Sequence, residues 1–572
     1  MTAATTRSEA TAIRLVLLWS FITTLICAVF LIFLTKGLLP DTRFTPIFRH
    51  LLITQDSHAV WLMLFITFMA TLWRWPDPIT HAVDWLAGNY KPVILLTFAL
   101  LAVGNYYIYH DYPVSMDEYS GVFQAQTFAS GQIIADLPPE LVDWLILPLF
   151  NGGFFFASPI TGQTVAFYWP GFALLLAPFE FLGFPWLCNP FLAALSMLLI
   201  YEITLLVCNS QRAAGWALLF TIASPAFAGN AISYYSMQAH MTANLLYVLL
   251  LLNPSTKRVV AAGLVGSLAL VMHNPFRHAI FAAPWVLAML WSKEQRRLLM
   301  PLILAYLPIT VFVGLGWAWL RTSIALPAHG DASIVGSTVG AYGMPFSSLD
   351  ISIIFLRLAT WVKMWCWAVP GIFLIAAWSA IEHRRNPAVA KMALSVLCTL
   401  FGFAFFVTDQ GHGWGNRQFH GAWGMIPILA ACAMTTRQEF RQRIVSFAGC
   451  SAILSLLLLT PTYLMQMERF VSGHLAQIPE PVKTDGNFFF INTREGFYTL
   501  DMIQNHPTLK GPEIRMTYRG ADANARIMQR YWPDATRVAA GPWGEHWRSP
   551  IYKPPLEPSV PDTLGTNGRL RE

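Results

Sequence analysis

The sequence MDEYSG at residues 116–121 places two adjacent carboxylates, Asp117 and Glu118, directly after a long apolar segment at residues 93–108. The residues that follow are neither plainly soluble nor plainly membrane-spanning, and they lead into the sequence YWPGF at residues 168–172. An Asp-Glu pair is common in solvated loops and at helix N-termini. The interpretation of this pair therefore depends on how the rest of the chain is organised.

The composition is that of a polytopic α-helical membrane protein. Of the 572 residues, 55% are hydrophobic and 12% are charged, whereas soluble domains carry about 25% charged residues. The 22 Trp and 40 Phe residues fit many membrane interfaces, where aromatic rings settle at the headgroup level. The net charge of +6 comes from short basic clusters between apolar runs, which indicates topology signals and argues against a nucleic-acid partner.

The cysteines argue against a disulfide framework and against a structural zinc site. They lie in or beside apolar runs, and no two of them have Cys-x-x-Cys spacing. They are Cys27, Cys188, Cys208, Cys366, Cys398, Cys432 and Cys450.

Thirteen apolar segments approach the length of about 20 residues that a spanning helix needs. We expect about thirteen transmembrane helices. They lie at residues 13–35, 58–73, 93–108, 186–207, 213–231, 241–252, 259–272, 279–291, 298–320, 365–381, 388–408, 422–435 and 445–465.

Basic clusters occur in every second connection between these segments, and such connections face the cytoplasm. This rule predicts a cytoplasmic N-terminus and places both Asp117 and everything after residue 465 outside. Lys36, Arg43 and Arg49 would then lie in an external loop, against the rule, so the orientation of the first two helices stays open. The clusters are Arg212, Lys257 and Arg258, Lys293 with Arg296 and Arg297, Arg384 and Arg385, and Arg437 with Arg441 and Arg443.

The predicted organisation is a transmembrane domain at residues 1–465 followed by a small external α/β domain at residues 466–572. Within the first, the external loop 109–185 is expected to form short interfacial helices, at 118–130, 137–150 and 167–183, none of which crosses the membrane. In the second, residues 488–491, 514–518 and 537–540 read as strands and residues 521–531 as a helix. The proline-rich tail from residue 550 is expected to be flexible.

The Asp-Glu pair after an apolar segment, the long interfacial loop and the topology resemble the GT-C superfamily of integral-membrane glycosyltransferases. Its protein O-mannosyltransferase and aminoarabinose transferase branches use a lipid-phosphate-linked sugar as donor. The resemblance covers residues 93–465 and is faint in the C-terminal domain, which is reminiscent of external domains thought to bind acceptors. It implies a GT-C fold in a bacterial cytoplasmic membrane, with the active site and the C-terminal domain facing the periplasm.

Sugar transfer from a polyprenyl phosphate requires a base that removes the proton of the acceptor hydroxyl. By resemblance to the family motif, Asp117 is assigned to this role, and Glu118 to orienting the site or raising the pKa of Asp117. Phosphate is already a good leaving group, so a second carboxylic acid is not needed, unlike in a glycoside hydrolase.

Charge that develops on the departing phosphate calls for cations on the external side. The most distinctive segment is GHGWGNRQ at 411–418, which resembles a glycine-rich, arginine-bearing loop of related transferases. Those loops more often contain Pro-Arg-Tyr, so the role of Arg417 is less certain here. We predict that six residues bind the lipid phosphate, and each has interfacial anchoring as its alternative reading: Arg417, Arg277, His240, His278, Lys363 and His412.

A divalent cation stays open as a cofactor, because Asp409, His412 and His420 could conceivably hold one, although no ligand spacing commits them to it. The partners expected are a polyprenyl-phosphate-linked sugar donor, a glycan, lipid or protein acceptor, and the lipid bilayer. Arabinofuranose or mannose would fit as the sugar. The alternative function is a transporter or flippase of a lipid-linked sugar intermediate. The scarcity of charge at the centres of the predicted spans favours the enzyme.

Overall fold

The computed structural model describes residues 2–39, 44–329, 351–404, 409–435, 438–482 and 485–555. Arg43, Arg437 and the tail from residue 556 lie outside these ranges. The chain divides into two compact units. Unit 1 comprises the described residues of Met1–Pro113, Trp169–Trp317 and Tyr342–Phe470, and unit 2 those of Val114–Tyr168, Ala318–Ala341 and Val471–Glu572.

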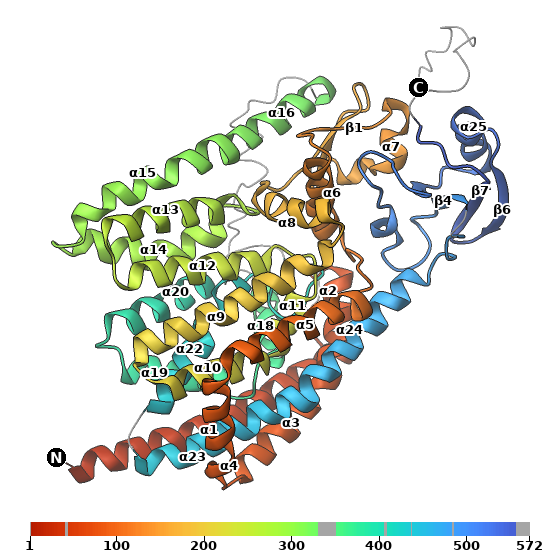
Figure 1. The fold of residues 1–572 in the computed structure, drawn as a ribbon. Helices are drawn as coiled ribbons and strands as arrows, with labels where there is room; N and C mark the ends of the chain where they lie inside the picture. The colour runs from red at the N-terminus through yellow and green to blue at the C-terminus, as the bar shows by residue number, and fades with distance from the viewer. Residues whose placement is uncertain are drawn as a thin grey trace. The chain divides into compact units, whose positions relative to one another are not determined.

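Unit 1 is built from α-helices (Figure 1). They are α1 (Thr2–Thr35), α2 (Pro46–Leu51), α3 (Ser57–Leu72), α4 (Pro76–Gly88), α5 (Tyr90–Ile108), α8 (Gly171–Leu182), α9 (Cys188–Cys208), α10 (Gln211–Ile222), α11 (Pro225–Ala231), α12 (Met237–Leu252), α13 (Thr256–Val271), α14 (Phe276–Trp291), α15 (Leu299–Ile309), the start of α16 (Gly316–His329), α18 (Ile351–Cys366), α19 (Ile372–Glu382), α20 (Pro387–Ala404), α21 (His420–Trp423), α22 (Met425–Cys432), α23 (Gln438–Leu454) and most of α24 (Thr460–Leu475).

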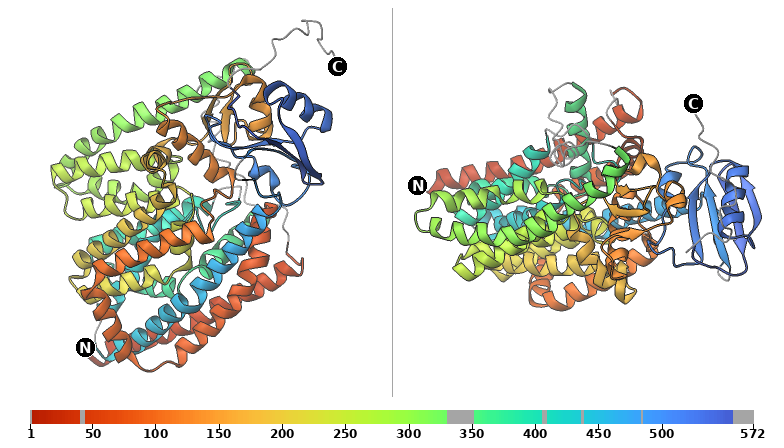
Figure 2. Two further views of the ribbon diagram at one scale, coloured as in Figure 1. Left: turned by 45° about the vertical axis from the view of Figure 1, so that its right-hand side comes forward. Right: turned by 90° about the horizontal axis from the view of Figure 1, so that it is seen from above.

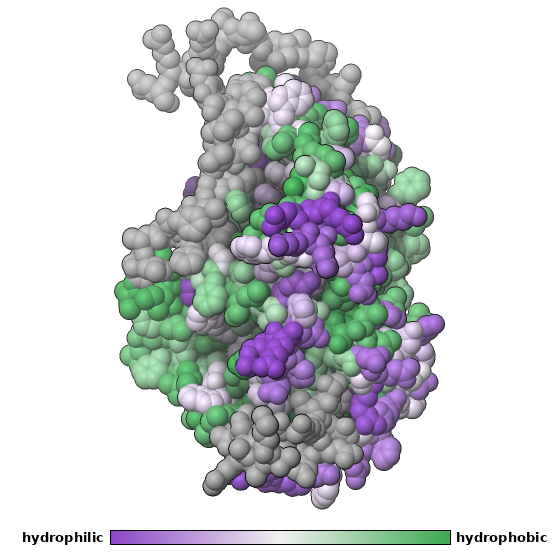
Figure 3. Space-filling view, turned by 90° about the vertical axis from the view of Figure 1, so that its left-hand side faces the viewer, coloured by the Kyte–Doolittle hydropathy of each residue, from purple (hydrophilic) through white to green (hydrophobic). Residues whose placement is uncertain are grey.

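Seven helical segments of the described chain are long and apolar enough to cross a membrane, judged by length and composition. Each overlaps one of the thirteen predicted segments. Their outward surfaces carry large apolar side chains such as Leu95 and Phe312, and Figure 3 shows one face on which apolar areas lie between separate hydrophilic patches. The spans are Ile13–Thr35, Pro46–Leu72, Tyr90–Ile108, Pro185–Cys208, Arg296–Ile324, Pro387–Ala404 and Gln442–Leu475.

The predicted number of thirteen spans is not confirmed, and proline explains two of the differences. Segment 213–231 is divided into α10 and α11 at Ser224, because Pro225 can begin a helix but cannot continue one. Segment 365–381 is interrupted between α18 and α19 at Pro370 and Gly371, and Gly371 has a φ of +81°. Helices α12, α13 and α14 have 16 residues each, fewer than the about 20 of a perpendicular span. Helix α8, which was predicted not to cross the membrane, has 12 residues.

The interior of unit 1 is formed by α10, α11, α12 and α22, most of whose side chains are buried. Small residues allow this dense packing. A Cβ on Gly215 of α10 would lie 2.7 Å from the carbonyl oxygen of Val83 in α4. Only glycine therefore permits this approach of the two helices.

Three of the candidate spans contain a π-helical turn: Leu52–Asp56, Thr310–Leu315 and Ser455–Leu459. Such turns insert an extra residue and re-aim the side chains that follow, and they are frequent at functional sites. The first of them joins α2 to α3.

Unit 2 contains α6 (Met116–Ala129), α7 (Val142–Leu145), the remainder of α16 and α25 (Ala521–Tyr531). It also contains a three-stranded sheet, in the order β1-β3-β2. The prediction of a helix at 118–130 is confirmed by α6, whereas the helix expected at 137–150 is reduced to the four residues of α7 and two short 3-10 turns. The strands are β1 (Ala135–Asp136), β2 (Phe155–Ala157) and β3 (Gln163–Ala166).

The C-terminal part of unit 2 is a four-stranded sheet in the order β5-β4-β7-β6, visible with α25 beside it in Figure 2 (right). β4 is parallel to β5 and antiparallel to β7. The three strands and the helix predicted here fall on β4, β5, β6 and α25, and β7 was missed because its sequence GEHWRS is polar. The strands are β4 (Gly486–Ile491), β5 (Glu513–Thr517), β6 (Thr536–Gly541) and β7 (Gly544–Ser549).

A single hydrophobic core joins residues of Val114–Tyr168 to residues of Val471–Glu572 in unit 2. In β4, the ring of Phe488 lies 4.4 Å from that of Trp532, just after α25, and Phe490 lies 5.8 Å from Trp144 of α7. Residues 114–168, predicted as part of the transmembrane domain, thus share a core with the C-terminal residues. Of the three segments of unit 2, only the last coincides with the predicted external domain.

Candidate active site

Glu118 caps the helix in which it lies. Ser115 is the N-cap of α6 and Glu118 is its third residue, which is the spacing of a capping box. Oε2 of Glu118 accepts hydrogen bonds from the backbone N–H of Val114 (3.0 Å) and from the hydroxyl of Ser115 (3.3 Å). The side chain is fully buried. These contacts hold Glu118 in place and fix the start of α6.

Asp117 differs from its neighbour, because it is only half-buried. Oδ1 of Asp117 accepts a hydrogen bond from the hydroxyl of Tyr168. It lies in the first turn of α6, where the helix dipole favours a negative charge. The structure therefore brings together the two sequence segments from which the prediction started, MDEYSG and YWPGF.

Arg321 supports the backbone next to Tyr168. Nη1 of Arg321 donates to the carbonyl oxygen of Phe167 (2.5 Å), and its guanidinium lies 4.9 Å from the centre of the Phe167 ring. The residue is 1% exposed. This contact positions the tyrosine that binds Asp117. Arg321 was not among the predicted site residues, because no local motif marks a contact between distant segments.

A third carboxyl group, Asp501, interacts with the acidic pair. Burial raises the pKa of Asp501 well above its ordinary value, and the charges of Asp117 and Glu118 raise it further. Tyr119 ties the same segments together, since its hydroxyl donates to the carbonyl oxygen of Asn505 (2.6 Å) and accepts from the backbone N–H of Asn505 (2.7 Å).

In unit 1 two of the predicted phosphate-binding residues lie next to each other. Nη1 of Arg277, in the first turn of α14, donates to the backbone carbonyl oxygen of Arg417 (3.2 Å). The guanidinium of Arg417 lies 5.0 Å from the centre of the Tyr235 ring. Coulombic interactions link both arginines to His273, which the sequence did not single out.

His240 of α12 lies close to the two arginines, because Arg277 and His273 act on it electrostatically. Its side chain is fully buried. Neither ring nitrogen has a hydrogen-bond partner among the residues that the structure describes. A buried imidazole without hydrogen-bond partners lowers the stability of the folded protein by about 1–3 kcal/mol.

His412 is linked to Arg417 through Tyr235, and His278 lies in a separate hydrogen-bonded network. The hydroxyl of Tyr235 is hydrogen bonded to Nδ1 of His412 (2.6 Å). The two ring nitrogens of His278 are each 2.7 Å from a polar partner, the side-chain oxygen of Asn244 and the hydroxyl of Tyr306. These contacts give His278 a structural role in packing α14.

Lys363 forms a buried ion pair. Its Nζ lies 2.9 Å from Oδ2 of Asp56, and both side chains are fully buried. Oδ1 of the same carboxylate accepts hydrogen bonds from Nε1 of Trp367 (2.7 Å) and from the hydroxyl of Tyr463 (2.9 Å). An ammonium held in this way argues against the predicted role of Lys363 as a phosphate ligand.

The backbone conformation of the glycine-rich loop requires glycine at three positions. Gly411, Gly413 and Gly415 all have positive φ, of 63°, 142° and 60°, a region that other residues rarely adopt. The side chain of Gln410 closes the loop by accepting from the N–H of Arg417 (3.1 Å) and donating to the carbonyl oxygen of Gly415 (2.8 Å). The loop thus holds Arg417 in a defined place.

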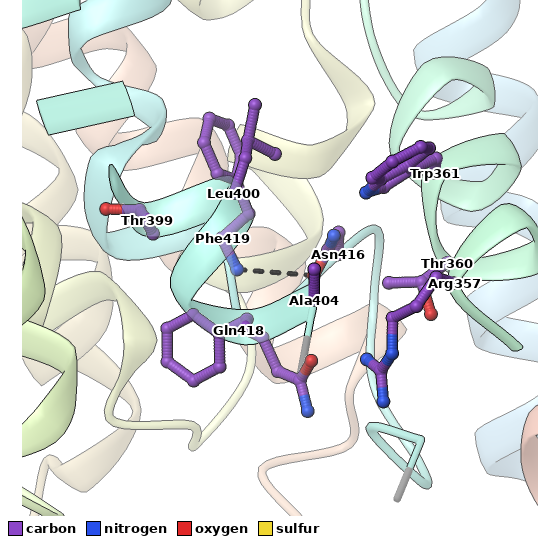
Figure 4. Close-up of a pocket in the computed structure, with 10 residues that line it drawn as sticks. Arg357, Thr360, Trp361, Thr399, Leu400, Ala404, Asn416, Gln418 and Phe419 are labelled. Carbon is purple, nitrogen blue, oxygen red and sulfur yellow. Dashed lines mark hydrogen bonds between the residues drawn. The ribbon is translucent and has the colours of Figure 1, made fainter. Parts of the chain in front are cut away.

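A narrow pocket adjoins this loop (Figure 4). It lies between α18, α20 and residues 416–419. The side chains of Arg357 and Gln418 extend toward the same side of it, and Oδ1 of Asn416 accepts from the N–H of Phe419 (3.2 Å). Arg357 is therefore a further buried cation beside the loop, which the sequence analysis missed.

Within the described part of the chain, no three His, Cys, Asp or Glu side chains are placed to hold a metal ion. Asp409, which was considered as a ligand, accepts hydrogen bonds from the N–H groups of Thr45 (2.6 Å) and Gly411 (2.7 Å). Nε2 of His420 lies 3.4 Å from Oε1 of Gln238. These contacts give each of the two residues its own partners.

No family model matches this chain, and no curated protein matches it. Solved structures similar to it include two of one protein. One is a crystal structure of ArnT from Cupriavidus metallidurans bound to undecaprenyl phosphate, with 11% identity, covering 80% of this chain and 98% of that chain at a TM-score of 0.48. The other is the same protein in the apo state, with 12% identity, the same coverage and a TM-score of 0.45. A similarity of this degree leaves the roles of residues in this chain to be argued from its own contacts.

Proposed function

We propose that this protein is an inverting glycosyltransferase. It moves a sugar from a polyprenyl-phosphate donor to a hydroxyl group of a glycan, lipid or protein, on the periplasmic side of a bacterial cytoplasmic membrane. The observation that carries the proposal is a group of basic side chains in unit 1, the guanidinium cations of Arg277 and Arg417 and the imidazole of His240, which gather from α14, the glycine-rich loop and α12. Such a group suits the phosphate of a lipid carrier.

The reaction needs one proton transfer and one displacement. The carboxylate of Asp117 takes the proton of the acceptor hydroxyl, whose oxygen then forms a bond to the anomeric carbon of the sugar. The bond from that carbon to the phosphate oxygen breaks, and its electron pair stays on the polyprenyl phosphate. Attack from the opposite face inverts the anomeric configuration.

Asp117 is chosen over Glu118, because Glu118 is fully buried and already caps α6. The guanidinium groups of Arg277 and Arg417 stabilise the negative charge that develops on the leaving phosphate, through charge-assisted hydrogen bonds.

A flippase of the same lipid is the second candidate. The Asp56–Lys363 pair favours it, because ionisable residues within a span often mark a transport path. The Asp56–Lys363 pair is fully buried, however, and Asp56 is also hydrogen bonded to Trp367 and Tyr463. The acidic pair Asp117 and Glu118, in the first turn of α6, would have no role in a flippase mechanism.

Binding of a polyprenyl phosphate to the purified protein tests the phosphate site. We expect Arg417→Gln to weaken this binding about 10- to 100-fold, the worth of a charged hydrogen bond of about 1.5–3 kcal/mol. Binding of the uncharged polyprenol should not change. The control is Arg443→Gln, which removes an equal charge from an exposed position of α23.

If Arg417→Gln and Arg443→Gln bind polyprenyl phosphate equally well, and both melt at the temperature of the wild type, Arg417 is not a phosphate ligand and the proposal loses its main support.

A further inference from the structure

A second pocket in unit 1 lies apart from the pocket beside the glycine-rich loop. It has a volume of about 450 Å³ and is bounded on one side by α2, the π-helical turn and α3, and on the other by α24. Figure 2 (left) shows α24 running beside these N-terminal helices. The residues that matter here are His50, Gln55, His58, Gln466, Arg469 and Phe470.

Two amide side chains in this pocket have unused acceptors. The side-chain oxygens of Gln55 and Gln466 are buried and have no hydrogen-bond partner among the residues that the structure describes. Gln55 is 2% exposed. An unpaired buried acceptor costs about 1–3 kcal/mol, so its presence calls for a ligand that donates hydrogen bonds.

The π-helical turn explains why Gln55 faces the pocket. Gln55 and Asp56 are its last two residues. The extra residue of the turn sends Asp56 inward, to its ion pair with Lys363, and leaves Gln55 on the pocket side. Polar residues inside a candidate span are costly, and they are kept where they have a function.

His58 adds a third polar side chain. Its Nδ1 lies 3.1 Å from the backbone carbonyl oxygen of Thr54 and 3.4 Å from the hydroxyl of Ser57. The described residues that line the pocket include no carboxylate, and Arg469 at its edge is exposed.

Phe470 supplies an aromatic surface and connects the pocket to the glycine-rich loop. Its ring centre lies 5.3 Å from that of His412 and 6.1 Å from that of Trp414. His412 in turn is hydrogen bonded to Tyr235, over which Arg417 lies. The pocket is therefore linked through direct contacts to the group of basic side chains proposed to hold the phosphate.

We propose that this pocket binds a glycosyl unit. The two unpaired amide oxygens beside an aromatic ring match a neutral sugar, whose hydroxyl groups donate and whose C–H face packs on the ring. The proposal rests on the proposed function and deepens it, because it locates the sugar that is transferred or the sugar that accepts it. A donor sugar and an acceptor sugar would present the same hydroxyl groups and C–H face to the pocket.

The test measures binding of three kinds of probe to the full-length protein in nanodiscs. The probes are a polyprenyl phosphate, polyprenyl-phosphate sugars carrying mannose or arabinofuranose, and the methyl glycosides of these two sugars. Gln55→Leu and Gln466→Leu remove the acceptors at similar size. Gln442→Leu is the matched control, since Gln442 is exposed on α23.

We expect each pocket variant to weaken the binding of a sugar-bearing probe about three- to tenfold, the worth of one neutral hydrogen bond, with no change for polyprenyl phosphate or for Gln442→Leu. A loss confined to the sugar-bearing lipid identifies the donor sugar. A loss confined to the methyl glycosides identifies an acceptor sugar.

The proposal is overturned if both pocket variants bind every probe like the wild type, or if they weaken polyprenyl phosphate as much as the sugar-bearing lipid. Either result leaves the proposed function in place. Conversely, if the wild type binds the methyl glycosides and the pocket variants do not, but no polyprenyl probe binds, the sugar pocket stands and the proposed donor is wrong.

Discussion

Asp117 and Glu118 are adjacent in the sequence, yet their different surroundings give them different roles. Glu118 has the spacing of a capping box relative to Ser115 and accepts a hydrogen bond from its hydroxyl, and this spacing could have been recognised from the sequence. Asp117 receives the hydroxyl of Tyr168, a contact across 51 positions of the chain. No local pattern encodes that contact or the approach of Asp501, because both depend on how distant segments pack.

The first prediction separates these two roles. Gln can accept the same hydrogen bonds as Glu in a capping box, so Glu118→Gln should keep the melting temperature close to that of the wild type and reduce sugar transfer by less than about tenfold. Asp117→Asn should reduce transfer by about 100-fold or more, because it removes the base. Transfer assays on reconstituted protein, with melting curves alongside, measure both.

A loss of transfer in Glu118→Gln as large as that in Asp117→Asn, at an unchanged melting temperature, would show that the charge of Glu118 is catalytic and not merely structural.

The second prediction concerns pH. The raised pKa of Asp501 means that the folded protein holds a proton that the unfolded chain releases above about pH 3.9. The folded state is therefore destabilised as pH rises from about 4 toward the folded-state pKa of this carboxyl group. Asp501→Asn removes the effect, so its melting temperature should exceed that of the wild type by a margin that grows as the pH rises above about 4 and levels off above the folded-state pKa of Asp501.

A margin that stays constant as the pH rises above about 4, or that shrinks, would contradict the raised pKa of the buried Asp501.

At the scale of elements, predictions from the sequence succeeded where a pattern is local and failed where packing decides. The amphipathic helix α25 was predicted at its observed bounds, Ala521–Tyr531. The hairpin of β2 and β3 was missed, because its short strands are stabilised by the core of unit 2 and not by their own sequence. The interrupted helices of unit 1 were taken as continuous, although Pro225 and Pro370 marked the breaks.

The third prediction addresses the ion pair that connects α18 to the start of α3. Asp56→Asn should lower the stability by about 3–5 kcal/mol, because it leaves the ammonium of Lys363 buried without a counter-charge. The double change Asp56→Asn with Lys363→Met should recover most of this loss. Melting temperatures in detergent measure it.

The control is the ion pair of Arg212 with Asp84, whose side chains are 39% and 42% exposed. Asp84→Asn should cost less than about 1 kcal/mol, since water screens an exposed pair. Equal losses for Asp56→Asn and Asp84→Asn would refute the importance of the buried pair.

At the scale of the whole molecule, composition and hydropathy sufficed to predict a mostly helical membrane protein. The division into units did not follow from composition, because residues 114–168 look like a loop between spans but share a hydrophobic core with the C-terminal residues. The candidate site was only partly predictable. Arg277, Arg417 and His240 were found by their types and positions, whereas Tyr235, Arg321, Arg357 and Asp501 owe their roles to contacts between distant segments.

The central claim is that the chain transfers sugar from a polyprenyl phosphate with Asp117 as the base. The most direct measurement is transfer of a labelled sugar from such a donor to an acceptor glycan by protein reconstituted in liposomes, comparing the wild type with Asp117→Asn at equal amounts. We predict transfer by the wild type, a loss of about 100-fold or more in the variant, and donor binding retained by both. Unchanged transfer by Asp117→Asn would contradict the assignment of the base, and movement of the lipid between leaflets without any transfer would identify a flippase instead.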